Sequence, residues 1–165
     1  MTRGALYHHF RDKAELFRTV MEQVAIEVAA QLVEGELARD AEDPADAWTQ
    51  LRTGFQSLLD LSTADTDFQR IVLIDGPAVL GNDAWDALVE RTGYRLLSAW
   101  LERAVTEQSI EAVPVGPLTR MVAALLSEAS IYIARAPDPD AARAEIGVVL
   151  DRMLRGLARG GAATP

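Results

Sequence analysis

Apolar residues recur at helical spacing along most of the chain, and this pattern predicts an all-α fold. Over residues 12–37 they return every three or four positions, the period that gathers side chains on one face of a helix. That face consists of Leu16, Val20, Val24, Val28 and Leu32, with Phe17 and Met21 beside them. The sequence contains no alternating strand pattern, hairpin turn signal or internal repeat.

Local start signals divide the chain into further helices. Asp12 and Glu15 have the spacing of a capping box at the start of the first long helix. Asp43-Pro44, Gly116-Pro117 and Asp138-Pro139 each predict another start, because proline loses no hydrogen bond at the first helical position. A further helix is expected over residues 83–107. Two of these helices carry large inward faces, formed by Trp48, Leu51, Phe55, Leu58 and Leu59 and by Trp85, Leu88, Val89, Leu96, Trp100 and Leu101.

The segment from Gln69 to Pro77 is ambiguous, because its four-residue apolar run fits a buried strand or a short buried helix. A strand that ends in Asp75-Gly76 could lead into an active-site loop. It would need partner strands, however, and the rest of the sequence offers none. A helix that ends at Asp75-Gly76-Pro77 is therefore the favoured interpretation.

Composition fits one globular domain, or one domain with a small attachment, in a chain of 165 residues of which 49% are hydrophobic and 25% charged. The chain has no cysteine, which excludes disulfides, thiol catalysis and Cys-ligated zinc. No apolar run approaches the roughly 18 residues of a membrane span, and the first residues lack the apolar region of a signal peptide. We therefore expect a cytoplasmic protein without a membrane partner.

Charge is distributed unevenly along the chain, whose net charge is −9. Residues 1–18 contain four basic and two acidic side chains, so this segment carries +2 and the remainder carries −11. Phosphate contacts need a basic surface. Any contact with nucleic acid is therefore expected at the basic end, although a short imbalance of this kind also fits ordinary solvated surface.

Candidate catalytic and metal-binding groups are scarce. The two histidines, His8 and His9, are adjacent, so on a helix they point about 100° apart and do not readily share one metal ion. The sequence contains none of the common nucleophile, zinc-protease, phosphate-binding or dinucleotide-binding motifs. We therefore expect neither an enzyme nor a bound metal or cofactor.

The opening residues carry the most specific signal in the chain. A short polar helix over residues 2–10, followed directly by a long helix, has the form of a helix-turn-helix with its recognition element. Residues 2–17 resemble the third helix and the start of the fourth helix of TetR-family transcriptional regulators, through the pattern Leu-Tyr-x-His-Phe-x-x-Lys-x-x-Leu that begins at Leu6. Residues 74–81 and the last two helices resemble one branch of the same family.

This resemblance implies a set of DNA contacts. In the family the recognition helix enters the major groove, where Arg3 would meet base edges or phosphate. Lys13 would meet a phosphate at the positive end of the long helix. Gly4 would allow close approach, and Tyr7 and His9 match positions that contact backbone and bases. The implied DNA-contacting residues are Thr2, Arg3, Gly4, Tyr7, His9 and Lys13.

The same resemblance implies that two scaffold helices should precede this segment. A nine-residue helix over residues 2–10 is marginal in isolation. We therefore expect that Met1 marks a misplaced start or a truncation and that the chain as given binds DNA poorly, which the genomic frame upstream of Met1 would test. Residues 1–18 would then be the remnant of a DNA-binding domain, and residues 19–165 a ligand-binding and dimerisation domain.

In the family, the last two helices of each subunit form a four-helix dimer interface. A homodimer would match a palindromic operator; the alternative is that these apolar stripes are simply monomer core. The predicted interface comprises Leu118, Met121, Val122, Leu125, Ile146, Val149, Leu150, Met153 and Leu157.

The middle helices of the family enclose a pocket for a small-molecule effector. The predicted pocket residues are Trp48, Phe55, Phe68, Trp85, Tyr94 and Trp100, each of which could instead be ordinary core. Candidate polar anchors are Gln69, Arg91, Glu128 and Tyr132. The favoured function is a repressor that an effector releases from operator DNA. The alternatives are a ligand-binding dimerisation module without DNA binding, and an all-α enzyme that uses unrecognised carboxylate chemistry.

Overall fold

Helices account for nearly all of the secondary structure, which confirms the all-α prediction. The computed structural model describes residues 10–42, 45–65 and 68–159. These ranges contain no strand, and their β-pairing is limited to an isolated bridge between Ile110 and Ala158. The elements, of which η1 and η2 are π-helical, are α2 (Lys13–Glu42), α3 (Ala47–Ala64), η1 (Phe68–Asp75), α4 (Gly76–Leu80), α5 (Asn82–Val89), η2 (Glu90–Tyr94), α6 (Arg95–Thr106), α7 (Val115–Arg135) and α8 (Pro139–Arg155).

The start of α2 is capped by the predicted pair of carboxylates. Asp12 Oδ1 accepts a hydrogen bond from the backbone N–H of Glu15 at 2.8 Å. The Glu15 carboxylate reaches back to the backbone N–H of Arg11 at 2.6 Å, one residue earlier than a standard capping box would place it. On the predicted inner face, Met21 is fully buried, whereas Val20 is 40% exposed. The apolar face of α2 is therefore centred beside Met21.

The predicted start of the second long helix was wrong. Asp43-Pro44 lies outside the described residues, and α3 begins at Ala47 with Asp46 as its N-cap. The Asp46 carboxylate accepts hydrogen bonds from the backbone N–H groups of Trp48 and Thr49, both at 3.0 Å. Asp46 thus satisfies two of the donors that a helix start leaves free, and the helix begins where that carboxylate can reach them.

The ambiguous segment is helical, and the strand alternative is wrong. It forms the π-helical η1, and the chain then continues directly into α4. The predicted terminator Asp75-Gly76-Pro77 is also wrong, because Gly76 opens α4 and the turn comes later, at Gly81, which has a φ of 76°. Gly81 uses the left-handed backbone region that a residue without a Cβ adopts without strain.

The later helices follow the predicted boundaries closely. The helix expected over residues 83–107 is present as α5, η2 and α6 in direct succession, so a π-helical turn interrupts it. The helix α7 starts at Val115, one residue before the predicted Gly116-Pro117. The predicted start at Asp138-Pro139 is confirmed, since Asp138 Oδ1 accepts a hydrogen bond from the backbone N–H of Ala141 at 3.1 Å.

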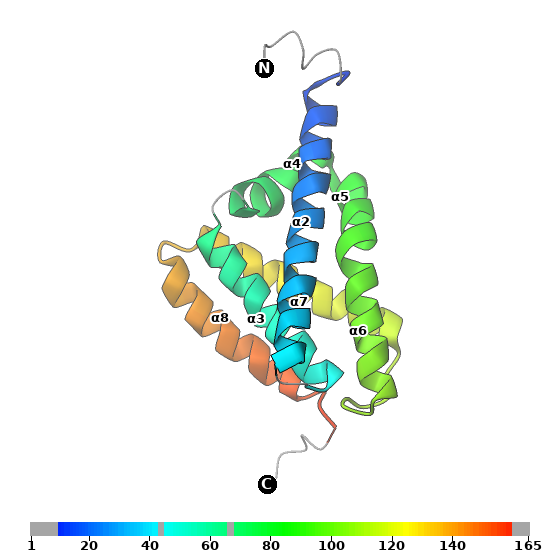
Figure 1. Ribbon diagram of the computed structural model, residues 1–165. Helices are drawn as coiled ribbons and strands as arrows, with labels where there is room; N and C mark the ends of the chain where they lie inside the picture. The colour runs from blue at the N-terminus through cyan, green and yellow to red at the C-terminus, as the bar shows by residue number, and fades with distance from the viewer. Residues whose placement is uncertain (1–9, 43–44, 66–67, 160–165) are drawn as a thin grey trace.

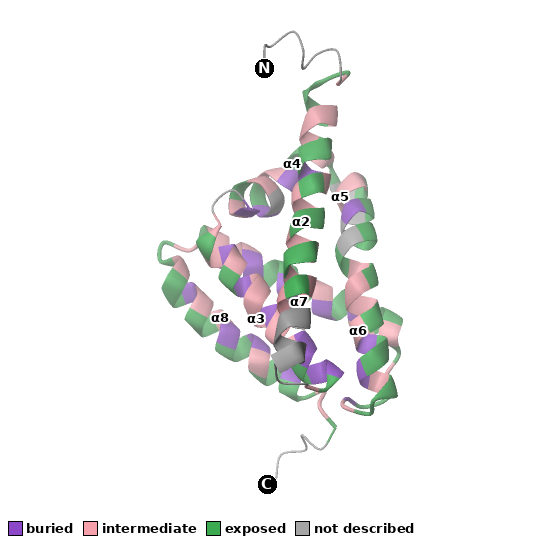
Figure 2. Ribbon diagram, viewed as in Figure 1, coloured by how far each residue is buried: buried purple, intermediate pink, exposed green. Residues whose placement is uncertain are grey.

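Helix α3 lies at the centre of the molecule and contacts α2, α6, α7 and α8 (Figure 1). Figure 2 shows buried positions concentrated along α3 and along the side of α8 that faces it. The main core joins α3, α6, α7 and α8. A smaller buried cluster joins α2 to the segment after α3, and its members are Met21, Phe68, Leu73 and Leu88. Among the described helices, none is both long and apolar enough to cross a membrane.

Candidate functional site: an apolar cavity

A cavity of about 260 Å³ lies between α2 and the middle helices. Its walls come from α2, α3, η1, α5, η2, α6 and α7, so residues far apart in the sequence surround one space. Five of the six aromatic residues predicted for a pocket line it, namely Phe55, Phe68, Trp85, Tyr94 and Trp100. The volume is close to the lower end of the range of about 300–1,000 Å³ for small-molecule sites.

Small residues on facing elements leave room for the cavity. Ala25 and Ala29 are four residues apart and therefore share one face of α2. Gly54 on α3, Gly93 on η2 and Ala123 on α7 line the other walls. Because these positions carry a single methyl group or none, the large aromatic side chains opposite them do not fill the whole space.

The cavity wall is almost entirely apolar. Among its described lining residues none is charged, and the side chains with a hydroxyl group are those of Tyr94, Ser127 and Ser130. Ser127 and Ser130 are three residues apart on α7, so their hydroxyl groups lie on neighbouring positions of one face. Such a site suits an apolar, uncharged molecule that carries one or two hydrogen-bonding groups, because a buried charge without a partner is costly.

Trp48, the sixth predicted pocket residue, does not line this cavity. Its side chain is 4% exposed and packs in the main core near the start of α3. The indole Nε1 has no hydrogen-bond partner among the described residues. Trp48 instead lines a separate polar hollow between the start of α3 and the end of α8.

The four candidate polar anchors also lie outside the cavity. Gln69 Nε2 donates to the backbone carbonyls of Ser62 and Thr63, at 2.7 and 3.2 Å, and so ties η1 to the end of α3. Arg91 forms an exposed ion pair at 2.7 Å with Glu22. The remaining two, Glu128 and Tyr132, are exposed on α7.

The sequence interpretation did not identify the two serines or the small residues of the wall. A serine inside a helical apolar stripe is a weak signal, because such hydroxyls commonly bond to the preceding turn. The pair Ala25 and Ala29 was the available signal for the α2 wall, since alanines at this spacing make one helix face flat.

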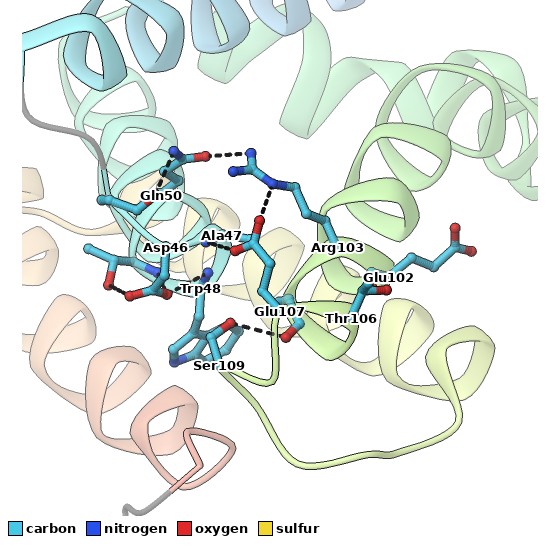
Figure 3. Close-up of polar contacts among 12 residues, drawn as sticks. Asp46, Ala47, Trp48, Gln50, Glu102, Arg103, Thr106, Glu107 and Ser109 are labelled. Atoms are coloured by element: carbon cyan, nitrogen blue, oxygen red, sulfur yellow. Dashed lines mark hydrogen bonds and ion pairs between the residues drawn. The ribbon is translucent and has the colours of Figure 1, made fainter.

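A polar cluster fixes the start of α3 against the end of α6 (Figure 3). Glu107 Oε2 accepts a hydrogen bond from the backbone N–H of Ala47 at 2.8 Å. Arg103 Nε donates to the other oxygen of Glu107 at 2.6 Å, and Arg103 Nη1 donates to Gln50 Oε1 at 3.0 Å. The bond from Ala47, and after it the contact with Arg103, holds the pKa of Glu107 below its ordinary value.

Gly76 brings α2 and the cavity wall into close contact. A Cβ at Gly76 would lie 2.6 Å from Met21 Cε and 2.8 Å from Trp85 Cζ3. Met21 belongs to α2 and is fully buried, whereas Trp85 lines the cavity. Packed side chains thus connect the cavity to α2 at a point only eight residues from the start of that helix.

The predicted DNA-contacting residues lie largely outside the described part of the chain. This applies to Thr2, Arg3, Gly4, Tyr7 and His9. Lys13 is described: it is the first residue of α2 and is exposed. It therefore lies at the helix N-terminus, and its contact with a phosphate stays a prediction.

The predicted dimer residues fall into three groups by exposure. Met121, Val149 and Met153 are 68%, 51% and 52% exposed on α7 and α8. Val122 and Leu150, by contrast, are buried in the core of the subunit itself. The remaining four are partly buried against that core: Leu118, Leu125, Ile146 and Leu157.

Comparison with known proteins shows which family the chain belongs to. Residues 48–157 match the family described as tetracyclin repressor-like, C-terminal domain. The crystal structure of a TetR-family transcriptional regulator from Pectobacterium atrosepticum, at 1.64 Å resolution, matches with a TM-score of 0.79 and 29% sequence identity. That match covers 96% of this chain and 78% of the other. No curated protein sequence matches the chain. The chain therefore belongs to the TetR family of transcriptional regulators.

Proposed function

We propose that this chain is the regulatory part of a repressor that a small, apolar, uncharged effector releases from operator DNA. The observation that carries the proposal is the apolar cavity, because one of its walls is α2 itself. Ala25, Val28 and Leu32 of α2 line the cavity, and the same helix begins at Lys13, directly after the segment that resembles a recognition helix. One continuous helix therefore joins the cavity wall to Lys13, and through this helix a bound effector would act on the DNA-contacting residues.

An effector changes DNA affinity only through its own preference between two arrangements of the protein. If it binds the DNA-free arrangement more tightly than the DNA-bound one, it shifts the population away from DNA by that difference in affinity. Met21 and Trp85 both lie against Gly76 and belong to one packed cluster, which gives a physical route for the preference, since a ligand that displaces Trp85 also changes the packing around Met21 of α2.

A homodimer formed by α7 and α8 is the second part of the proposal. Large apolar side chains on these two helices remain exposed in the subunit: Met121, Tyr132, Val148, Val149 and Met153. An exposed apolar surface of this kind is typical of an interaction site. Two copies that pair through the same surface have two-fold symmetry, which matches a palindromic operator.

Cavity binding is tested with a neutral apolar fluorescent probe, N-phenyl-1-naphthylamine. We expect saturable enhancement of its fluorescence by the chain. The variant Ala29→Trp should abolish this enhancement, because the larger side chain fills the cavity. Ala30→Trp is the matched control, since Ala30 is exposed on the neighbouring face of α2 and is not a lining residue. Equal probe binding by the two variants would contradict the assignment of the site.

Operator release is tested by gel shift with the intergenic DNA beside the gene. The protein used should be the longest product of the reading frame, with and without a ligand that displaces N-phenyl-1-naphthylamine from the cavity. The repressor proposal expects a shifted band that the ligand removes in the parent protein but not in Ala29→Trp. Saturable probe binding together with dimerisation, but without a DNA shift, would favour the ligand-binding dimerisation module.

A further inference from the structure

A second hollow, which we call the basic hollow, lies between the start of α3 and the end of α8. Its lining includes Arg52 from α3, Arg152 and Arg155 from α8, and Arg159 from the segment after α8. Asp46 and Trp48 line it on the α3 side. Four guanidinium groups on one concave surface are unexpected in a chain with a net charge of −9.

The carboxylates near the basic hollow neutralise only half of this charge. Asp151 binds both Arg52 and Arg155, the latter with Nε at 2.6 Å. The Asp46 carboxylate faces the start of α3, where it accepts hydrogen bonds from Trp48 N–H and Thr49 N–H. Within the described residues, Arg152 and Arg159 have no carboxylate partner. Four positive and two negative groups leave the hollow with two unbalanced positive charges.

A buried donor also lies at this hollow without an acceptor. Trp48 is 96% buried, since its exposed fraction is 4%, and its indole Nε1 has no hydrogen-bond partner among the described residues. Figure 3 shows the indole ring directed away from the Arg103–Glu107 pair, on the side of α8. Buried N–H groups are nearly always paired with protein, water or ligand, so an oxygen from outside the chain fits this donor.

The shape of the basic hollow is held by backbone contacts. The backbone N–H of Arg159 donates to the carbonyl of Ser109 at 3.1 Å, and that of Glu111 donates to the carbonyl of Leu157 at 3.2 Å. The segment after α8 is therefore fixed to the loop after α6. In Figure 1 this end of α3 and α8 lies opposite the N-terminal end of α2, so the basic hollow is separate from Lys13, the first residue of α2.

We infer that the basic hollow binds a phosphate group, carried by inorganic phosphate or by a small phosphomonoester. A phosphate monoester carries about −1.5 to −2 charges at pH 7 and presents three acceptor oxygens. Its charge matches the two unbalanced positive charges of the hollow. Its oxygens can accept hydrogen bonds from the guanidinium groups of Arg152 and Arg159 and from the indole N–H of Trp48. A guanidinium group binds phosphate with paired hydrogen bonds.

The test is a titration of the ¹⁵N-labelled full chain with inorganic phosphate at constant ionic strength, with chloride as the balancing ion. The variant Trp48→Phe assigns the indole N–H resonance of Trp48. We expect a saturable shift of that resonance. In Arg152→Gln/Arg159→Gln the dissociation constant should rise by about tenfold per arginine, because a hydrogen bond to a charged group contributes about 1.5–3 kcal/mol.

Arg135→Gln is the matched control, because Arg135 is an exposed arginine at the end of α7 and does not line the basic hollow. Its dissociation constant should equal that of the parent chain. The absence of a saturable shift overturns the proposal, and so does an equal loss of affinity in Arg135→Gln. Tighter binding of succinate than of phosphate overturns the assignment to phosphate.

Glycerol 3-phosphate, titrated in the same way, separates the two sources of the phosphate group. Tighter binding than that of inorganic phosphate supports a phosphomonoester ligand, and equal or weaker binding supports free phosphate. Because the basic hollow and the apolar cavity use different residues, Ala29→Trp should leave the phosphate titration unchanged. Failure of one site is therefore distinguishable from failure of the other.

Discussion

A side chain at Gly76 would collide with Met21 and with the ring of Trp85, and this makes Gly76→Ala a test of the packing between α2 and the cavity. Met21 Cε is the end of a flexible chain and can move, but the Trp85 ring is rigid. We expect the substitution to lower the free energy of unfolding by about 1–3 kcal/mol, the usual range for overpacking a core. Urea denaturation followed by circular dichroism measures this change.

Gly116→Ala is the control for that experiment. A Cβ at Gly116 meets no atom within 4 Å, and the residue lies in the first turn of α7. Alanine has a higher helix propensity than glycine, so the control should be neutral or more stable by up to about 1 kcal/mol. Equal effects of the two substitutions would contradict the proposed close contact at Gly76.

Asp46 is the second residue with a defined local role, as the N-cap of α3. Asp46→Ala removes the acceptor for two backbone N–H groups and should cost about 1 kcal/mol of stability. Asp46→Asn keeps an acceptor oxygen at the same position and should restore most of that loss. Urea unfolding of the three proteins checks both expectations. A full loss in Asp46→Asn would indicate that the charge, rather than the cap, is what stabilises α3.

At the scale of elements, the exposed apolar face of α7 and α8 leads us to predict that two copies of the chain pair through it. Val149→Glu/Met153→Glu places two charges on this face, where both native side chains are about half exposed. We expect the variant to be monomeric by sedimentation velocity while its helical content stays unchanged. Val79→Glu is the control, because Val79 is 47% exposed on α4, away from α7 and α8, and should leave the proposed dimer intact.

Helix boundaries were predictable from the sequence where the signal is local. Asp138 and Pro139 determine the start of α8 by themselves, through a side-chain cap and a fixed φ, and that prediction is confirmed. The start of α3 was missed because the Asp-Pro-Ala-Asp stretch offers two aspartates. The second of these also lies where the distant Glu107 meets Ala47, a contact that no local pattern contains.

The π-helical elements and the position of Trp48 were not predictable from the sequence, for two different reasons. An apolar run has the same appearance whether the backbone bonds have α or π spacing, so η1 and η2 were not predictable from periodicity. Trp48 and Phe55 lie seven residues apart and share one face of α3, yet Phe55 lines the cavity and Trp48 does not. The two residues are about two helical turns apart along the axis of α3, and only the packed structure shows where along this helix the cavity lies.

At the scale of the whole molecule, three carboxylates with lowered pKa gather at one end of the helical body. The bond from the Ala47 backbone lowers the pKa of Glu107. Burial alone would raise the pKa of Asp46 and of Asp151, but hydrogen bonds from Thr49 and Trp48 to Asp46, and from Arg52 and Arg155 to Asp151, outweigh it. These groups lie at the start of α3, the end of α6 and the end of α8.

This arrangement predicts loss of stability in acid. Because each pKa is lower in the folded chain than in the unfolded chain, the stabilisation is present at neutral pH and is lost as the carboxylates take up protons. We expect the free energy of unfolding to fall progressively below about pH 5. Glu107→Gln should reduce this slope in urea unfolding measured from neutral to acidic pH. Glu102→Gln, at an exposed position on α6, should leave the slope unchanged.

In the proposed mechanism, the length of α2 determines how far a small change in the cavity is transmitted. Lys13 precedes Ala25, the first α2 residue in the cavity wall, by twelve positions, which corresponds to about 18 Å along the axis. A rotation of α2 by about 5° around the wall would move its first residue by roughly 1.5 Å, more than the tolerance of a hydrogen bond. The thickness of a ligand measured perpendicular to α2 would then determine the response, so chemically unrelated molecules of equal thickness should act alike.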